Sequence, residues 1–314
     1  GNYPLTTSNF CAILELPRYE SEVTPMNKYT IKDFERDFPN DDACLEWLKN
    51  NRWSNGIHCI KCQRITKHYK VSGRPAYACE FCGNHIYPMA DTILEHSATP
   101  LRLWFHAMFL MGSTRCGISA KQLQRELGVT YKTAWRMFKQ IRSMLDEDVM
   151  KLLGEVEVDE TYVGGKRRGK RGRGAEGKII VVGAAQRNGK VIAKVVPDVK
   201  RSTLVPFVAR KVSSKDTILY TDEFPSYDHM LRLGYNHKRI EHHAKIYVRG
   251  NIHTQTIDGF WSLVKRGIDG VHHKVGANYL QDYINTYSFR WNHRNDEKPM
   301  FLQILSRLVP SLMA

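Results

Sequence analysis

Three aspartates stand where their carboxylates could share a metal-dependent reaction. Asp159 lies in the strand-like run 155–163, Asp222 ends the strand-like run 217–222, and Asp258 lies in the first turn of a helix expected over 256–266. Carboxylates that converge from separate elements bind Mg²⁺ through oxygen and leave places for water and phosphate oxygens. In two-metal phosphodiester chemistry, one ion activates the attacking oxygen and the other stabilises the leaving oxygen. We expect Asp159 to bridge both ions, Asp222 to bind one and Asp258 the other.

The stretch 256–267 is expected to form the helix that presents Asp258. Thr256 is a candidate N-cap, and Lys265 follows Asp258 by seven residues, two turns on, on roughly the same face. Apolar residues recur at helical spacing to give one buried stripe: Ile257, Phe260, Trp261 and Val264. The alternative is a surface helix with ordinary charges, and a single aspartate at a strand end is more often a cap or a salt bridge. Three acids at matching elements of a basic chain favour the metal site.

Two glutamates neighbour Asp159 in the sequence. A strand alternates its side chains between two faces, so Glu160 is expected opposite Asp159 and Glu157 on the same face. Glu157 is therefore the reserve candidate for a third carboxylate, and Gln255 is the reserve neutral ligand, if Asp258 is not a ligand.

Four of the seven cysteines form two Cys-x-x-Cys pairs, Cys59 with Cys62 and Cys79 with Cys82, with sixteen residues between the pairs. Such pairs fit one tetrahedral zinc ion held by four thiolates. Four protein ligands leave no position for a catalytic water, so this zinc would be structural. The alternatives are two disulfides or a redox pair. No secretion signal is evident, which favours zinc over disulfides.

The charge of the chain indicates a polyanionic partner. The 314 residues carry a formal net charge of +15, with an ordinary hydrophobic content of 42%. A pI near 9.5 suits either nucleic acid or an anionic membrane surface. No apolar run reaches the roughly 18 residues that a membrane span needs, and no basic amphipathic helix carries the charge. The charge therefore favours nucleic acid over a membrane, and with the DNA-binding segments described below the expected partner is double-stranded DNA.

Residues 99–146 are expected to be helical, with a helix-turn-helix layout in their second half. Ser119 would cap one helix, Gly128 would end it, and Thr130 would cap a second helix that runs through Arg142. The polar faces of this second helix would carry Tyr131, Lys132, Thr133, Arg136, Lys139 and Arg142. We expect Tyr131, Lys132 and Arg136 to bind DNA, since such a helix contacts bases with its N-terminal residues. A plain helical hairpin is the alternative.

A second DNA-binding segment is expected in the basic, glycine-rich loop 164–174. Such a loop cannot bury a core and would meet phosphates without sequence preference. Its predicted DNA-binding residues are Lys166, Arg167, Arg168, Lys170 and Arg171.

The order of elements after residue 152 predicts a ribonuclease H-like mixed sheet with helices on both faces. The expected strands are 155–163, 179–185, 191–196, 217–222 and 236–240, and the expected helices are 202–212, 226–233, 256–266 and 277–291. We thus expect an α/β multidomain chain. Its parts would be an N-terminal tail over 1–34 (with 1–25 a natural tail or a cloning remnant), an N-terminal helix and zinc ribbon over 35–95, a helix-turn-helix domain over 96–150, a ribonuclease H-like catalytic domain over 151–300, and a C-terminal tail or helix over 301–314.

Together these motifs resemble the DDE transposases of the bacterial insertion-sequence family numbered 1595, whose eukaryotic relatives are the Merlin elements. The likeness covers about residues 35–300 and rests on the four paired cysteines and on the segments 157–166, 220–222 and 253–267. It implies transfer of an insertion sequence by attack of a 3′-hydroxyl on target DNA, with two Mg²⁺ or Mn²⁺ ions per active site. It also implies a homodimer on DNA, in a bacterial cytoplasm at the nucleoid or in a eukaryotic nucleus.

The resemblance suggests that Lys265, with Arg266 beside it, lies near the transposon end. One departure concerns the third acid, which is usually glutamate in such families and is Asp258 here. Aspartate is one methylene shorter, so the helix must lie closer to the metal or a water must bridge. Two other functions stay open: a DNA-binding regulator with an inactive catalytic domain, and a nuclease of the same fold that hydrolyses without joining strands.

Overall fold

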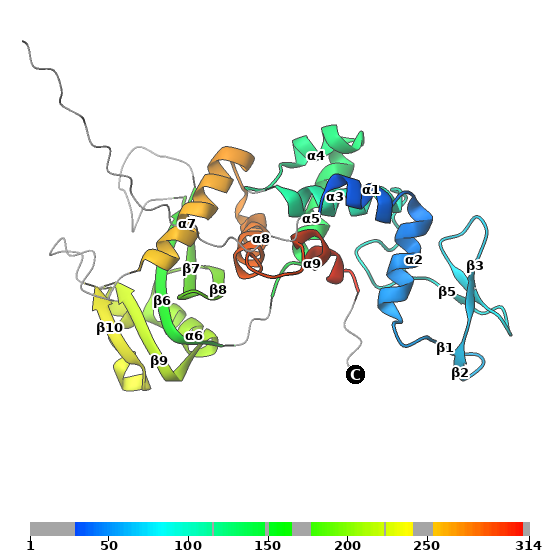
Figure 1. Cartoon of the computed structure of the whole chain (residues 1–314). Helices are drawn as coiled ribbons and strands as arrows, with labels where there is room; N and C mark the ends of the chain where they lie inside the picture. The colour runs from blue at the N-terminus through cyan, green and yellow to red at the C-terminus, as the bar shows by residue number, and fades with distance from the viewer. Residues whose placement is uncertain are drawn as a thin grey trace, which may run out of the picture.

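The computed structural model describes residues 29–114, 116–147, 151–164, 177–222, 224–240 and 254–309. Figure 1 shows a sheet with its covering helices at one end of the molecule, a bundle of helices in the middle, and the cysteine-bearing ribbon at the other end. Within the described ranges, no helix combines the length and apolarity that a membrane crossing requires.

The first two helices belong to the bundle and not to a tail. Helix α1 spans Ile31–Asp37 and α2 spans Asp41–Arg52; Thr30 and Asn40 accept backbone N–H bonds at their N-caps. The tail expected over 1–34 therefore overlaps α1, whose Phe34 is fully buried. On α2 the expected inward face is present, because Cys44, Leu45 and Leu48 are all buried.

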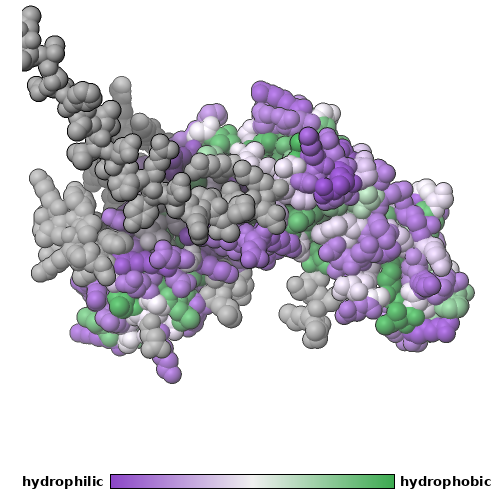
Figure 2. Space-filling model, viewed as in Figure 1, coloured by the Kyte–Doolittle hydropathy of each residue, from purple (hydrophilic) through white to green (hydrophobic). Residues whose placement is uncertain are grey.

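The ribbon consists of two small antiparallel sheets. Its strands are β1 (Ile57–Cys59), β2 (Arg64–Thr66), β3 (His68–Lys70), β4 (Tyr77–Cys79) and β5 (His85–Ile86). Several large apolar side chains stay exposed here, including Ile60, Ile65 and Phe81. Figure 2 shows hydrophobic colour gathered at the end of the molecule where Figure 1 places β1 and β2, whereas hydrophilic residues cover much of the remaining coloured surface in that view.

The helix-turn-helix layout is present as expected. Its helices follow α3 (Leu101–Ser113) and are α4 (Ala120–Leu127) and α5 (Tyr131–Ser143). The side chains of Ser119 and Thr130 cap α4 and α5, and Gly128 ends α4 in the left-handed conformation with φ 65°. One residue was placed wrongly from the sequence. Arg142, expected on a polar face of α5, is only 4% exposed because α8 covers that side of the helix.

One hydrophobic core joins the N-terminal helices to the helix-turn-helix. It holds Phe34 and Leu45 together with Trp104 of α3 and Met137 of α5. Helix α9, Met300–Ser306, adds Phe301, Ile304 and Leu305 to the same core. The chain therefore returns after the sheet to pack against its own N-terminal part.

The five-stranded sheet has the ribonuclease H order. Its strands are β6 (Leu152–Val163), β7 (Ile179–Gln186), β8 (Val191–Val196), β9 (Val212–Asp222) and β10 (Asn236–Ile240). They lie in the order β10-β9-β6-β7-β8, with β6, β9 and β10 parallel and β7 antiparallel to both of its neighbours. The mixed sheet predicted from the sequence is confirmed.

Helices cover both faces of this sheet. On one face lie α6 (Arg201–Lys211) and the 3₁₀ turns η1 (Pro225–Tyr227) and η2 (Leu231–Leu233). On the other lie α7 (Gln255–Gly267), its π-helical extension η4 (Ile268–His272) and α8 (Leu280–Asn292). The 3₁₀ turn η5 (Ala277–Tyr279) precedes α8, and its Tyr279 packs against Trp135 of α5. The helix expected over 226–233 is thus two short 3₁₀ turns, since Pro225 opens the segment and Gly234, at φ 84°, closes it.

Candidate active site at the sheet and helix α7

Asp159 projects from β6 toward α7. The indole Nε1 of Trp261 donates a hydrogen bond to its Oδ2 at 3.1 Å. Gly183 pairs with Asp159 across the strands, and a Cβ on Gly183 would lie 2.6 Å from the Trp261 ring. A side chain at this position of β7 would therefore push Trp261 away. The glycine lets the indole lie on the sheet and hold the Asp159 carboxylate.

Asp258 lies in the first turn of α7 with an exposed side chain, and Thr254 Oγ1 donates to its Oδ2 at 3.2 Å. The N-cap of α7 is Thr254 and not Thr256, which stands two residues further on. The predicted apolar stripe is confirmed, since Ile257, Phe260, Trp261 and Val264 are all buried.

Asp222 ends β9, next to β6 in the sheet. The backbone N–H of Phe224 donates to its Oδ1 at 3.0 Å, which fixes the carboxylate at the turn after the strand. The three predicted aspartates therefore stand on the first strand, the fourth strand and the helix that covers the sheet.

Electrostatics link the three aspartates. The pKa of Asp159 is raised to about 7, first by burial and then by the charges of Glu160, Asp222 and Asp258. The aspartates do not yet form a compact cage. Among the described residues, only the four cysteines bring three or more ligand atoms within 4.8 Å of one another. Acids that repel one another in this way suit a cation, because a divalent charge would reverse the repulsion.

Glu157 has a role that the sequence did not reveal. It is fully buried, and its Oε2 accepts the backbone N–H groups of Thr256 and Ile257 at 2.8 and 3.0 Å. Its Oε1 accepts from Arg187 Nε at 2.8 Å and from the Thr256 hydroxyl at 3.2 Å. The first N–H groups of a helix have no partner within the helix, and its dipole favours an anion there. Glu157 thus anchors the start of α7 to β6, and both of its oxygens are engaged.

Glu160 points to the other face, as the alternation predicts. Tyr227, buried beside α6, donates its hydroxyl to Glu160 Oε2 at 3.1 Å. The neighbouring acids of β6 therefore serve different purposes: Glu157 holds the helix, Asp159 faces the site, and Glu160 bonds across the opposite face.

A pocket of about 890 Å³ opens beside these acids. Asp159 and Asp258 both line it, and Lys265 and Arg266 of α7 line it too. Lys178, just before β7, is a further cation on its wall that the sequence did not single out. In the sequence, Lys178 looks like a continuation of the basic loop. Only the pairing of β6 with β7 reveals that it lies on the wall of this pocket. A wall with both acids and cations can hold metal and phosphate together.

The four paired cysteines form the second site. Cys59 Sγ lies 3.5 Å from Cys82 Sγ, and Cys62 Sγ lies 3.8 Å from Cys79 Sγ. A zinc tetrahedron with Zn–S bonds of about 2.3 Å has sulfur–sulfur edges of about 3.8 Å. All four cysteines are free thiols, so the alternative of two disulfides is not what the structure shows. A hydrogen bond with Thr66 lowers the pKa of Cys79 to about 6, whereas hydrogen bonding to Cys82 and burial raise the pKa of Cys62 to about 12, so without metal the cluster holds a thiolate beside a neutral thiol.

The predicted DNA-binding residues of α5 lie at the surface. Tyr131, Lys132 and Arg136 are exposed, and Lys121 of α4 lies 5.7 Å from the Tyr131 ring centre. Arg136 also contacts Thr99 Oγ1 at 3.1 Å, which fixes its direction. The residues predicted in the basic loop, Lys166, Arg167, Arg168, Lys170 and Arg171, lie outside the described residues.

The sheet order, with an antiparallel meander of β6, β7 and β8 and with β9 and β10 parallel to β6, defines a ribonuclease H-like fold. Residues 151–292 match the ISXO2-like transposase domain, and residues 39–85 match the transposase zinc-ribbon domain of the insertion-sequence family numbered 1595. The two matches together span more than half of the chain. The chain belongs to this family of DDE transposases.

Two curated relatives agree with this assignment. The chain is 28% identical over 274 residues to an uncharacterized protein in transposable element ISH50 of Halobacterium salinarum, which covers 81% of this chain and 91% of the relative. It is 32% identical over 120 residues to an uncharacterized transposase-like protein of Haemophilus influenzae, over 38% of this chain and 94% of the relative.

A solved structure is also similar. The crystal structure of the Mos1 Strand Transfer Complex shares 12% identity over 68% of this chain and 77% of that chain, with a TM-score of 0.28. At that score the likeness adds nothing to the topology described above.

Proposed function

We propose that the chain is an active transposase that binds the ends of its own element, cleaves them and joins them to target DNA. The observation that carries this proposal is the pocket that Asp159 and Asp258 share, with Asp222 close enough to raise the pKa of Asp159. A carboxyl group in a cleft whose pKa is raised by burial and by neighbouring acids is typical of a functional site.

The chemistry would proceed in two displacements at phosphorus. In the first, water attacks at the element end, the P–O3′ bond breaks, and a 3′-hydroxyl is released. In the second, that hydroxyl attacks a target phosphodiester, loses its proton, and a new P–O3′ bond replaces the one that breaks. Bound divalent ions would stabilise the attacking and leaving oxygens.

The protein residues would hold the ions and the DNA. Asp159 is the candidate bridging ligand, and Asp222 and Asp258 are the candidate ligands of one ion each. Trp261 keeps the Asp159 carboxylate in one orientation, and Glu157 fixes the helix that presents Asp258. Lys265 and Arg266 line the same pocket and are proposed to bind phosphates of the element end. Mg²⁺ or Mn²⁺ is the proposed ion in this site, with one structural Zn²⁺ in the ribbon.

Recognition of the end is assigned to the exposed N-terminal half of α5, through Tyr131, Lys132 and Arg136. The loop residues Lys166, Arg167, Arg168, Lys170 and Arg171 would add salt-dependent affinity without sequence preference. We propose a homodimer on DNA, because two ends must be joined in one event. The protein would act where its DNA is, at a bacterial nucleoid or in a nucleus.

A cleavage and strand-transfer assay tests the proposal. The substrates are labelled duplexes from the ends of the encoding element, a plasmid target, and Mg²⁺ or Mn²⁺. Asp258→Asn keeps the shape of the side chain and removes the charge that a hard cation needs, so we expect no detectable cleavage or joining. End binding should remain. Asp269→Asn is the matched control, since Asp269 lines the same pocket outside the proposed triad.

The outcomes separate the competing functions. A parent protein that binds ends but never cleaves them would be a DNA-binding regulator. One that cleaves without joining would be a nuclease. Full activity of Asp258→Asn would remove Asp258 from the site and leave Gln255 as the reserve ligand, because the oxygens of Glu157 are already engaged.

A further inference from the structure

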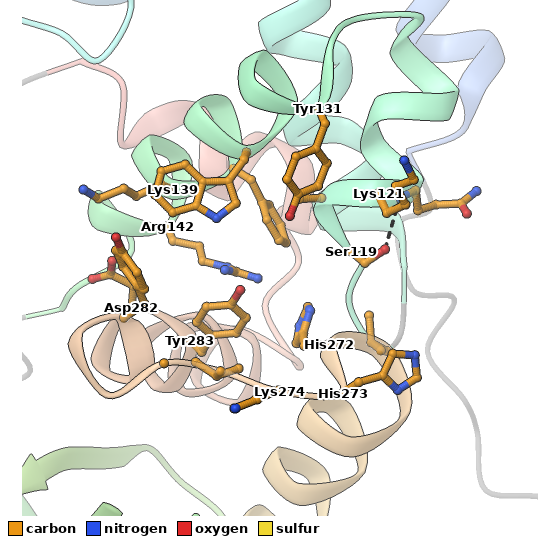
Figure 3. A pocket seen from close by; sticks show the side chains of 18 of the residues that line it. Ser119, Lys121, Tyr131, Lys139, Arg142, His272, His273, Lys274, Asp282 and Tyr283 are labelled. Atoms are coloured by element: carbon orange, nitrogen blue, oxygen red, sulfur yellow. Dashed lines mark hydrogen bonds between the residues drawn. The ribbon is translucent and has the colours of Figure 1, made fainter. Parts of the chain in front are cut away.

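A second pocket lies between the helix-turn-helix and the segment that follows α7. Its volume is about 470 Å³, and its walls come from α4, α5, residues 271–276, η5 and the start of α8. Figure 3 shows Arg142, His272 and Tyr283 facing its centre. Positive charge dominates the lining, since Asp282 is the single acid among the described residues that line it. The lysines and arginines that line it are Lys121, Arg125, Lys139, Arg142 and Lys274.

Arg142 is the buried cation of this pocket. Its guanidinium carbon lies 3.5 Å from the ring centre of Phe138 and 3.3 Å from that of Tyr283, so two aromatic rings lie directly against the group. In the described part of the chain, its Nε has no hydrogen-bond acceptor and no carboxylate lies within 4.0 Å of the guanidinium. The rings stabilise the faces of the cation, and the Tyr283 hydroxyl also favours its charged form, but the Nε–H group has no acceptor among the described residues.

Arg290, a second arginine nearby, has hydrogen-bond acceptors for its guanidinium. Arg290 donates to the carbonyl oxygens of Met111 and Thr114 at the end of α3. Its charge is therefore used to close a helix C-terminus, as a structural arginine does. Arg142 has no such partner, although it lines the small cavity that Arg290 also lines.

The single acid of the described lining does not balance its positive charge. The pKa of His272 is lowered to about 3, first by burial and then by the charges of Arg142 and Arg290, so this imidazole stays neutral. Asp282 lies within electrostatic range of Arg142 but forms no ion pair with it. A buried cation without a counter-ion is costly, so the arrangement is explained best by an anion that arrives from outside.

We propose that this pocket binds a backbone phosphate of double-stranded DNA through the N–H edge of Arg142. The proposal rests on the proposed function, because it supposes that the chain binds DNA. A planar guanidinium donates two parallel hydrogen bonds to phosphate, and its edge is the part of Arg142 that the rings leave open. The bound phosphate would contact two parts of the protein at once. One is α5, the proposed DNA-recognition helix, and the other is the segment that follows α7, the helix of Asp258. The pocket therefore sets the position of the duplex between the two.

The test uses the full-length protein and the variant Arg142→Met, which keeps an unbranched apolar side chain beside the rings and removes the charge. Inorganic phosphate and chloride are compared at equal ionic strength. Phosphate should raise the melting temperature of the parent and not that of the variant. In chloride the variant should melt no lower than the parent, because a costly buried charge is gone. Its affinity for end DNA should fall about tenfold, and the slope of log affinity against log salt should shrink by about one.

Arg290→Met is the matched control. It should melt lower than the parent, since two carbonyl oxygens lose their donor, and it should keep the response to phosphate. An Arg142→Met protein with unchanged DNA affinity, or with an unchanged salt slope, would overturn the proposal. If the phosphate response vanished while DNA affinity stayed the same, the site would take free phosphate and the DNA assignment would be wrong. Failure of the parent to cleave would overturn the proposed function only, because the pocket is tested by binding.

Discussion

The two candidate metal sites of this chain are built in opposite ways. In the ribbon, four cysteines come from two short hairpins, and their sulfur atoms already lie within 4.8 Å of one another. In the sheet, three aspartates come from two strands and a helix and do not close together; burial first, and then the charges of Glu160, Asp222 and Asp258, raise the pKa of Asp159 to about 7. Thiols can be neutral, so they gather without a cost in charge. Carboxylates near neutral pH must be held beside one another by the surrounding fold.

This difference separates the purposes of the two sites. A metal in the ribbon would complete the fold, because the ribbon strands are only two or three residues long. The sheet has its own cores on both faces and needs no metal to form. We therefore expect loss of a cysteine to unfold structure, and loss of an aspartate to stop chemistry while leaving the fold intact or more stable.

The largest effect is expected in the ribbon. Cys59→Ser or Cys79→Ser should release about one zinc ion per chain and unfold the ribbon, because structural zinc contributes on the order of 10 kcal/mol to such domains. Metal analysis and a thermal melt measure both. Cys116→Ser is the control, since Cys116 is exposed and lies outside the cluster. Purified parent protein without zinc would remove the basis of the comparison.

The next effect concerns the anchor of α7. Glu157→Gln should destabilise the sheet domain by about 3 kcal/mol, because in either orientation the amide NH₂ faces an N–H donor of Arg187 or of the α7 backbone. Strand transfer should fall as well, since α7 presents Asp258. Thermal melts and the joining assay measure the two effects.

Glu155→Gln is the matched control for this variant. Glu155 accepts from Arg187 at 3.2 Å and from the Tyr220 hydroxyl at 2.7 Å, and neither contact holds α7. Glu155→Gln should lower the stability of the protein. Its strand-transfer activity should fall only as far as this loss of stability explains. Equal losses of joining in both variants would mean that Glu157 acts through general stability and not through the helix.

The elements of both sites were predictable because their signals are local. Each Cys-x-x-Cys pair is one turn, and the alternation along β6 assigned Asp159 and Glu160 to opposite faces before any fold was known. The caps Ser119 and Thr130 likewise depend only on residues three positions away. Such features need no knowledge of what packs against them.

The misplaced residues depend on distant contacts. Arg142 has polar neighbours in the sequence, and α8, whose Tyr283 covers it, begins about 140 residues later. Glu157 looked like a spare ligand because its partners Thr256 and Ile257 lie 99 and 100 residues away. The prediction of Thr256 as the N-cap is wrong for the same reason, since the Thr256 hydroxyl donates to Glu157 and does not cap its own helix. Local rules do not contain such pairings.

Asp258→Glu tests how rigidly the sheet site is held. The extra methylene moves the carboxylate, and a misplacement of about 1 Å can cost on the order of a hundredfold in rate. Anchored by Glu157, α7 has little freedom to shift, so we expect joining to fall by about that factor, with end binding unchanged. Activity equal to that of the parent would show that α7 shifts to accommodate the longer side chain. The aspartate site would then be more adaptable, and differ more from the preformed cysteine site, than we describe.

The smallest predicted effect has the opposite sign to that of the cysteine variants. The pKa of Asp159 is about 7 in the folded chain and 3.8 as its ordinary value. A raised folded-state pKa means that ionisation opposes folding. The contribution of Asp159 to stability is thus most favourable below pH 4 and is lost as the pH rises from about 4 to about 7.

Asp159→Asn removes this loss and keeps an oxygen that can accept from Trp261 Nε1. Without divalent metal, the variant should therefore be more stable than the parent at pH 8, and its advantage should exceed that at pH 5 by on the order of 2 kcal/mol. Denaturant unfolding at the two pH values measures the difference. Asp269→Asn, on the wall of the same pocket, is the control and should show no such pH dependence. An Asp159→Asn protein that is less stable than the parent at pH 8 would contradict this prediction. It would mean that the sheet acids, like the ribbon thiols, stabilise the fold. The two sites could then no longer be distinguished as one that completes the fold and one that strains it.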